Sequence, residues 1–119
     1  MNLVWIKCGG DAWCPLANVD LDSYKGVNGV YVIWNPKIKS RGSNVVRVGQ
    51  GDIEDRLTKH LKDPTITRYG KKDLLVTWAV VEGRKARRRI ERYLADELNP
   101  RVGSRFPDET PIQVNLPGQ

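Results

Sequence analysis

The 119-residue sequence predicts one α+β domain with a small central antiparallel β-sheet, made of a β-hairpin and a third strand and flanked by helices. Residues 27–34 and 45–49 are consecutive runs rich in β-branched residues, a pattern typical of a β-hairpin. After Gly49 the apolar residues recur at helical spacing, and a second helical pattern follows a third apolar run. These patterns predict the order hairpin, helix, strand, helix, tail along the chain. Consecutive elements usually pack together, so we expect neighbours in this order to be in contact.

The chain divides into an extension, a core and a tail within this single domain. Residues 1–26 mix glycine, proline and polar residues, and we expect a short strand at 2–7 followed by a loop. Residues 27–103 contain the predicted sheet and helices. Residues 104–119 form a tail that contains three prolines, with one extended piece at 112–116.

The first helix is predicted between Asp52 and Pro64. Asp52 is of the residue type that caps helix N-termini, and Ile53, Leu57 and Leu61 recur at a spacing of four residues. Proline cannot continue a helix interior, so Pro64 marks the end. The helix therefore has an apolar face for the sheet and a polar face for solvent.

The third strand and the second helix follow a polar segment. Residues 73–81, with the sequence DLLVTWAVV, are apolar almost throughout, as in a strand buried on both faces. Residues 84–98 form the longest helical pattern, with arginines outside one apolar stripe, and Asn99-Pro100 stops it. The stripe consists of Ala86, Ile90, Tyr93, Leu94 and Leu98.

The charge distribution favours a polyanionic partner. Twenty Lys and Arg against fourteen Asp and Glu give a net charge of +6. Ten of the basic residues lie in residues 37–72 and eight in residues 84–105. A compact fold can bring these two segments together as one phosphate-facing surface. In the alternative interpretation, the charges only keep a small domain in solution.

The sequence also bears on location. No apolar run approaches the roughly 20 residues that cross a bilayer, so we expect no membrane partner. The first residues lack the apolar segment of a secretory signal, which makes the cytoplasm the expected compartment. Cys8 and Cys14, the only cysteines, match no common zinc spacing. We expect both to be buried thiols, since a disulfide is disfavoured in a reducing compartment.

Four side chains stand out as candidates for chemistry. Arg56 and His60 are four residues apart on the first predicted helix, so they project from the same face. Glu91 lies beside the apolar stripe of the second helix, among arginines, and Tyr31 is in the middle of the first strand of the hairpin. Taken singly, these placements also fit a solvated helix surface, a surface ion pair of Glu91 with Arg87, and a core aromatic residue.

In chain order these residues resemble the GIY-YIG nuclease superfamily. Residues 29–31, Gly-Val-Tyr, are similar to the first motif of that family, and residues 47–49, Arg-Val-Gly, to the second, with Arg47 where the family has tyrosine. A helix with Arg56 and, four residues later, His60 follows, as in the family, and Glu91 comes in a later helix before a proline. The resemblance covers about residues 27–103.

The resemblance implies a metal-dependent endonuclease that hydrolyses phosphodiester bonds in DNA. Glu91 would hold one Mg²⁺ or Mn²⁺, and Arg56 would contact the phosphate. Tyr31 would position or deprotonate the attacking water, with His60 as its partner or as the proton acceptor. Arg47 could bind phosphate but could not act as a base. The asparagine that commonly follows the proline in the family has no clear counterpart, and Asn99 and Asn115 are the alternatives.

Basic residues outside this set would contact the nucleic-acid backbone, and a partner protein could direct the domain to its target. The predicted backbone contacts are Lys37, Lys39, Arg41, Lys59, Arg87, Arg88 and Arg89. Two other hypotheses remain open. Arg47 in place of tyrosine favours a catalytically inactive nucleic-acid-binding module on the same fold, and a solvated arginine face would suit a protein-interaction domain.

Overall fold

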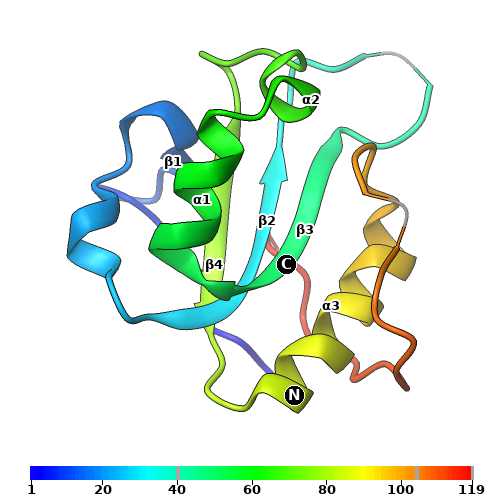
Figure 1. The fold of residues 1–119 in the computed structure, drawn as a ribbon. Helices are drawn as coiled ribbons and strands as arrows, with labels where there is room; N and C mark the ends of the chain where they lie inside the picture. The colour runs from blue at the N-terminus through cyan, green and yellow to red at the C-terminus, as the bar shows by residue number, and fades with distance from the viewer. Residues whose placement is uncertain (40, 104, 119) are drawn as a thin grey trace.

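The computed structural model describes residues 1–39, 41–103 and 105–118. Its strands form one antiparallel sheet in the order β1-β4-β2-β3, with β3 at one edge (Figure 1). The α+β class and the hairpin are confirmed. The strands are β1 (Cys14–Pro15), β2 (Asn28–Trp34), β3 (Val45–Asp52) and β4 (Leu75–Val80).

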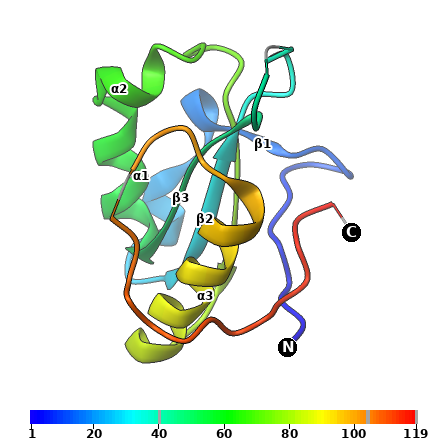
Figure 2. The same ribbon diagram turned by 90° about the vertical axis from the view of Figure 1, so that its right-hand side faces the viewer.

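Helices cover both faces of the sheet (Figures 1 and 2). The helix α1 (Ile53–Leu61) and the short helix α2 (Pro64–Thr67) lie on one face, together with the 3₁₀ helices η1 (Leu16–Asn18) and η2 (Leu21–Tyr24). The helix α3 (Arg84–Leu98) covers the other face. Among the described residues, no helix is long and apolar enough to cross a membrane.

The alternation of side chains in β2 divides the core between the two faces. Tyr31 and Ile33 pack on the side of α1, whereas Val30 and Val32 pack on the side of α3. In β4 four consecutive residues are buried, from Val76 to Ala79, which confirms the prediction of a strand covered on both faces. The central strands are therefore fixed from both sides, and this rigidity extends to the residues that follow them.

The helix boundaries follow the signals in the sequence. The Asp52 carboxylate accepts a hydrogen bond from the Asp55 backbone N–H at 3.0 Å, so Asp52 is the N-cap of α1 as predicted. α3 covers the predicted residues 84–98 and ends at Asn99, whose φ of 49° is the left-handed conformation common at helix C-termini. Pro100 then prevents continuation.

The helix α2 was not predicted, because residues 64–72 are mostly polar. The Asp63 side chain accepts a hydrogen bond from the Thr65 backbone N–H at 2.9 Å, and Pro64 takes the first helical position, where its missing N–H costs nothing. Ile66 is fully buried and fixes this turn against α1. An aspartate followed by proline was thus a usable signal in a segment too short for periodicity.

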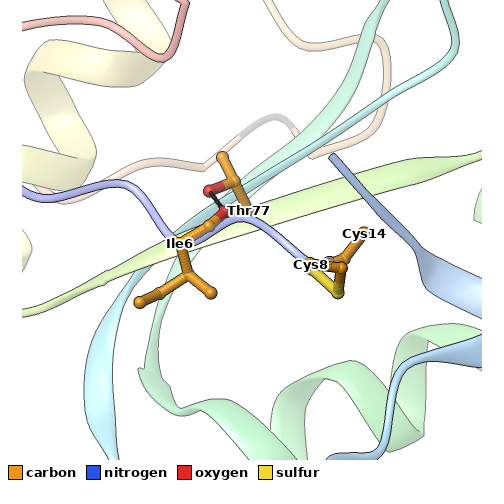
Figure 3. Close-up of a disulfide and its surroundings, with 4 residues drawn as sticks. All are labelled: Ile6, Cys8, Cys14 and Thr77. Carbon is orange, nitrogen blue, oxygen red and sulfur yellow. Dashed lines mark hydrogen bonds between the residues drawn. A yellow bond between two sulfur atoms is a disulfide. The ribbon is translucent and has the colours of Figure 1, made fainter. Parts of the chain in front are cut away.

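The prediction of a strand at residues 2–7 was wrong. β1 occupies the outer edge of β4 instead, and from the N-terminal segment only the Ile6 backbone N–H reaches that edge, donating to the Trp78 carbonyl at 2.9 Å. The Thr77 hydroxyl donates to the Ile6 carbonyl at 2.7 Å (Figure 3). A turn closed by the Cys8 N–H and the Ala12 carbonyl reverses the chain, so that β1 takes the pairing positions that a longer N-terminal strand would need.

The prediction of reduced cysteines was also wrong. Cys8 and Cys14 form a disulfide that joins the N-terminal segment to β1 (Figure 3). Cys14 is fully buried, as expected, and packs in the core on the α1 side. The expectation came from the assumed compartment, whereas the turn at residues 8–12 brings the two Cα atoms to 5.0 Å, within the range for a disulfide.

The C-terminal segment runs beside the N-terminal segment and not in the sheet (Figure 2). The predicted extended piece at 112–116 joins no strand. Its Asn115 side chain accepts from the Leu3 N–H and donates to the Leu3 carbonyl, and the Trp5 indole N–H donates to the Asn115 carbonyl at 2.9 Å. Val114 is buried against the α3 side of the core. The tail therefore closes the domain by pairing with its beginning.

Candidate active site

An open cavity of about 410 Å³ lies at the β3 edge of the sheet. Its wall combines side chains from β2, β3, α1, α3 and the tail, so residues distant in sequence meet there. The lining residues are Tyr31, Arg47, Gly49, Gln50, Arg56, Arg88, Glu91, Arg105, Phe106, Pro107 and Asp108. Four of the five residues predicted for catalysis are in this set, and the fifth, His60, is hydrogen-bonded to one of them.

Gly49 allows the Tyr31 hydroxyl to reach the cavity. Tyr31 and Gly49 are direct partners in the antiparallel register of β2 and β3. A Cβ atom built on Gly49 would lie 2.2 Å from the Tyr31 hydroxyl oxygen, so the tyrosine ring occupies the space that any other side chain would fill. The glycine of the second motif therefore has a steric reason, which is to let the tyrosine of the first motif pass over β3.

The Tyr31 hydroxyl oxygen lies 2.6 Å from His60 Nε2, and both side chains are buried. Burial raises the pKa of Tyr31, while the charges of Arg47 and Arg56 lower it. Burial, together with the charge of Arg47, lowers the pKa of His60 to about 4. At neutral pH the pair is therefore a neutral phenol in contact with a neutral imidazole. Within such a pair a proton can pass from the phenol to the imidazole without changing the net charge of the pair.

Arg56 is on the first turn of α1 with its guanidinium exposed at the cavity. Its Nε would lie 3.0 Å from a Cβ built on Gly51, whose φ of +134° is in the region that favours glycine. The backbone of β3 thus leaves room for the stem of the arginine. Within the described residues, no hydrogen bond or ion pair occupies this guanidinium, which leaves its donors available to a ligand.

Glu91 projects from α3 into the same cavity and is partly buried. Burial raises the pKa of its carboxyl, and the charges of Arg47, Arg56 and Arg88 lower it. The ion pair with Arg87 that the sequence allowed is not formed. Arg88 also lines the cavity, and its own ion-pair partner is Glu109, at 3.6 Å. Glu91 is therefore a carboxylate among cations that holds none of them in a salt bridge.

Arg47 enters the cavity from β3, on the same face as Gly49 because the two are two positions apart along a strand. The tail packs against its guanidinium, since a Cβ built on Gly103 would lie 2.6 Å from Nη1 of Arg47. Arg47 Nε is buried and has no hydrogen-bond partner among the described residues. A hydrogen bond from Arg47 to Tyr31 is among the factors that lower the pKa of the phenol.

Arg87, predicted as a backbone contact, is used inside the protein instead. The residue is buried, and its Nε donates to the Gln50 side-chain oxygen at 3.0 Å while Nη1 donates to the carbonyls of Val81 and Glu82. These bonds hold the start of α3 to the end of β4 and to β3. The placement of Arg87 thus gives no support to the predicted contact, because the residue is buried and its Nε and Nη1 already donate within the protein.

The other predicted backbone contacts lie outside the cavity, with the exception of Arg88. Lys37 pairs with Asp73 at 2.8 Å and Lys59 with Asp55 at 3.1 Å, and all four are solvent-accessible. Arg89 Nε donates to the Thr110 carbonyl at 2.9 Å. Two more, Lys39 and Arg41, are exposed in the connection between β2 and β3.

No pattern in the sequence predicts the wall formed by residues 105–108. This segment lines the cavity with Arg105, Phe106, Pro107 and Asp108, although it belongs to the predicted tail. The backbone N–H groups of residues 101 and 102 donate to the carbonyls of Val45 and Val46, which places the start of the tail along β3. The only signal for this arrangement is the length of chain that follows α3. The path of that chain along β3 is not revealed by a pattern of side chains.

Neither candidate for the missing asparagine lines the cavity. Asn99 is the left-handed C-cap of α3, and Asn115 is hydrogen-bonded to Leu3 at the opposite end of the tail. Both have structural roles that account for them. The polar amide nearest to the chemistry is instead Gln50, which lines the cavity and accepts from Arg87.

The carboxylates of the cavity fit a hard cation that keeps most of its waters. Among the described residues, no group of three or more His, Cys, Asp or Glu side chains could form a closed metal cage. Glu91 and Asp108 line the same cavity, and Mg²⁺ is often held by one or two carboxylates together with phosphate oxygens of the substrate. Glu91 and Asp108 would thus form an open metal site, in which oxygens of the substrate complete the coordination.

Comparison of the chain with models of known protein families, with curated proteins and with solved structures gave no match in any of the three. The case for a function therefore rests on the geometry of the cavity and on the motif residues it contains.

Proposed function

We propose that the protein is a metal-dependent endonuclease of the GIY-YIG type that hydrolyses phosphodiester bonds in DNA. The observation that carries this proposal is the convergence of the motif residues. Four of these residues come from four different elements and line one cavity, namely Tyr31, Arg47, Arg56 and Glu91. His60 is not part of the lining and contacts the Tyr31 hydroxyl. Structural packing alone does not require a buried tyrosine–histidine pair, two guanidiniums without ion pairs and a carboxylate at one place.

The tyrosine–histidine pair would manage the proton of the attacking water. With both groups neutral and the His60 proton on Nδ1, the Tyr31 hydroxyl would donate to His60 Nε2, and its oxygen would remain an acceptor toward the water. As the water oxygen attacks phosphorus, the phenol oxygen takes the water proton and passes its own proton to His60. A bound phosphate raises the basicity of His60, because its negative charge offsets that of the arginines.

The cations of the cavity would stabilise the phosphate. Attack by water adds negative charge to the non-bridging oxygens, and a preorganised guanidinium compensates for it without reorganisation. Arg56 is suited to this role because its donors have no other partner among the described residues. The leaving 3′ oxygen develops charge on the other side of the phosphorus, and Glu91 could hold a Mg²⁺ or Mn²⁺ there, which would supply Lewis-acid stabilisation when bound.

The test is cleavage of supercoiled plasmid and of a short branched DNA in Mg²⁺, Mn²⁺ or EDTA, with wild type beside Glu91→Gln. We expect nicking that requires the divalent ion and falls about 10²-fold or more in the variant. Glu97→Gln, the same change at an exposed position of α3, is the matched control and should cleave like wild type. Undiminished cleavage by Glu91→Gln would contradict the proposal.

A second candidate function is a nucleic-acid-binding module without catalysis. The observation in its favour is Arg47, which lies where the resembling family has a tyrosine and adds positive charge beside Tyr31. This function predicts binding of DNA that weakens with salt, with no cleavage under any metal condition. The same plasmid assay, combined with a binding measurement, separates the two functions.

A further inference from the structure

We propose that Arg47 is a phosphate ligand, which binds the same phosphodiester as Arg56 by direct charge contact, at the position where the resembling family has a tyrosine. The inference rests on the proposed function, because it assigns one more residue to that site. Its basis is the position, the surroundings and the unsatisfied hydrogen bonding of the Arg47 side chain.

The position of Arg47 is central to the cavity. Its charge is the first cationic influence on the pKa of each of Tyr31, His60 and Glu91, and in each case it outranks the charge of Arg56. Arg47 is also less exposed than Arg56, so water screens its charge less at these groups. A phosphate placed between Tyr31 and Glu91 would therefore meet Arg47.

The surroundings of Arg47 hold the guanidinium in place. Gly103, in the left-handed region with φ of +99°, packs against it so closely that a Cβ there would lie 2.6 Å from Nη1 and 3.4 Å from Cζ. Phe106, on the same segment, lies against Gly103 and lines the cavity. A flat guanidinium confined between β3 and the tail loses little freedom on binding, which favours recognition of a planar pair of phosphate oxygens.

The hydrogen bonding of Arg47 is incomplete without a ligand. Its Nε is buried without a partner among the described residues, and none of the ion pairs formed there includes Arg47. An unsatisfied buried donor on a charged group is costly, so its presence needs a reason such as a role in a site. A phosphate would meet the part of the Arg47 side chain that lines the cavity, since Nε itself is buried. Arg87 shows the contrast, since its guanidinium is buried with three protein acceptors.

The first arm of the test measures binding without metal. The affinity of a fluorescein-labelled DNA duplex is measured by anisotropy in EDTA across a salt series, for wild type, Arg47→Gln, Arg47→Lys and Arg92→Gln. Loss of one phosphate contact should reduce the slope of log K against log salt by about one. We expect that reduction in Arg47→Gln, with the slope restored in Arg47→Lys. Arg92→Gln removes the same charge from an exposed arginine paired with Asp96 and should keep the slope.

The second arm uses Arg47→Tyr, which restores the residue of the resembling family. If Arg47 grips the phosphate, this variant binds DNA with the reduced slope and cleaves more slowly than wild type. Equal or faster cleavage, or an unchanged slope in Arg47→Gln, would overturn the inference. If the wild-type protein cleaves DNA and Arg47→Gln keeps the wild-type salt slope, the proposed function stands and the inference about Arg47 is refuted. If the wild-type protein cleaves no substrate but Arg47→Gln reduces the slope, Arg47 binds phosphate and the proposed nuclease function is refuted. Thermal unfolding checks that each variant is folded.

Discussion

The two edges of the sheet differ in how far their polar groups have partners. At the β4 edge, the Thr77 hydroxyl donates to the Ile6 carbonyl and the Ile6 N–H donates to the Trp78 carbonyl, while a disulfide joins this segment to β1. At the β3 edge, Arg47 keeps a buried Nε without a partner in the described chain, and Arg56 has no ion pair there. Polar groups that only support a fold are normally paired. The difference fits the proposed function, in which the β4 edge would serve stability and the β3 edge would bind the phosphate.

The largest effect that this comparison predicts is at Gly49. Gly49→Ala should reduce cleavage about 10²-fold or more, because its Cβ would displace the Tyr31 hydroxyl from the position facing His60 and the cavity. The assay is plasmid nicking in Mg²⁺, with urea unfolding to measure stability. Gly9→Ala is the control, since nothing lies within 4 Å of a Cβ built there. If Gly49→Ala cleaves like wild type, the tyrosine does not act from this position.

Much of the fold was predictable, because helical spacing, N-cap chemistry and β-branched runs are local signals. Asp52 and the residues of α1 illustrate this. The site was predictable only in part. The motif residues were found by order along the chain, but the three consecutive arginines 87–89 of α3 look alike in sequence, and only packing reveals that Arg87 is buried while Arg88 reaches the cavity. The wall at residues 105–108 depends on the path of the tail, for which no side-chain pattern exists.

The next effect concerns His60 and pH. Its folded-state pKa of about 4 lies below the ordinary value of 6.5, so between these values the unfolded chain binds the proton more readily. This contribution to the free energy of unfolding is complete above pH 6.5 and is lost as the pH falls toward 4. We expect wild type to lose about 2–3 kcal/mol more than His60→Gln between pH 6.5 and 4.5.

Urea unfolding of both proteins at the two pH values measures this difference. The comparison with His60→Gln removes the contribution of the carboxylates, which titrate in both proteins. Parallel losses in the two proteins would mean that His60 is not held neutral by its surroundings. The uncharged state assigned to the tyrosine–histidine pair at neutral pH would then be wrong.

The smallest of the three effects tests the β4 edge. Reduction of the Cys8–Cys14 disulfide should lower the free energy of unfolding by about 2 kcal/mol, because it frees only a short loop in the unfolded chain. Cleavage should not change, since neither cysteine lines the cavity. Urea unfolding and plasmid nicking with and without a phosphine reductant measure both quantities, and a Cys8→Ala, Cys14→Ala double variant should not respond to the reductant.

Equal stability in both redox states would fit the cytoplasmic location expected from the sequence, because the fold would not need the bond. A loss of cleavage on reduction would instead mean that the two edges are coupled through β4 and β2. The assignment of stability to one edge and ligand binding to the other would then be wrong.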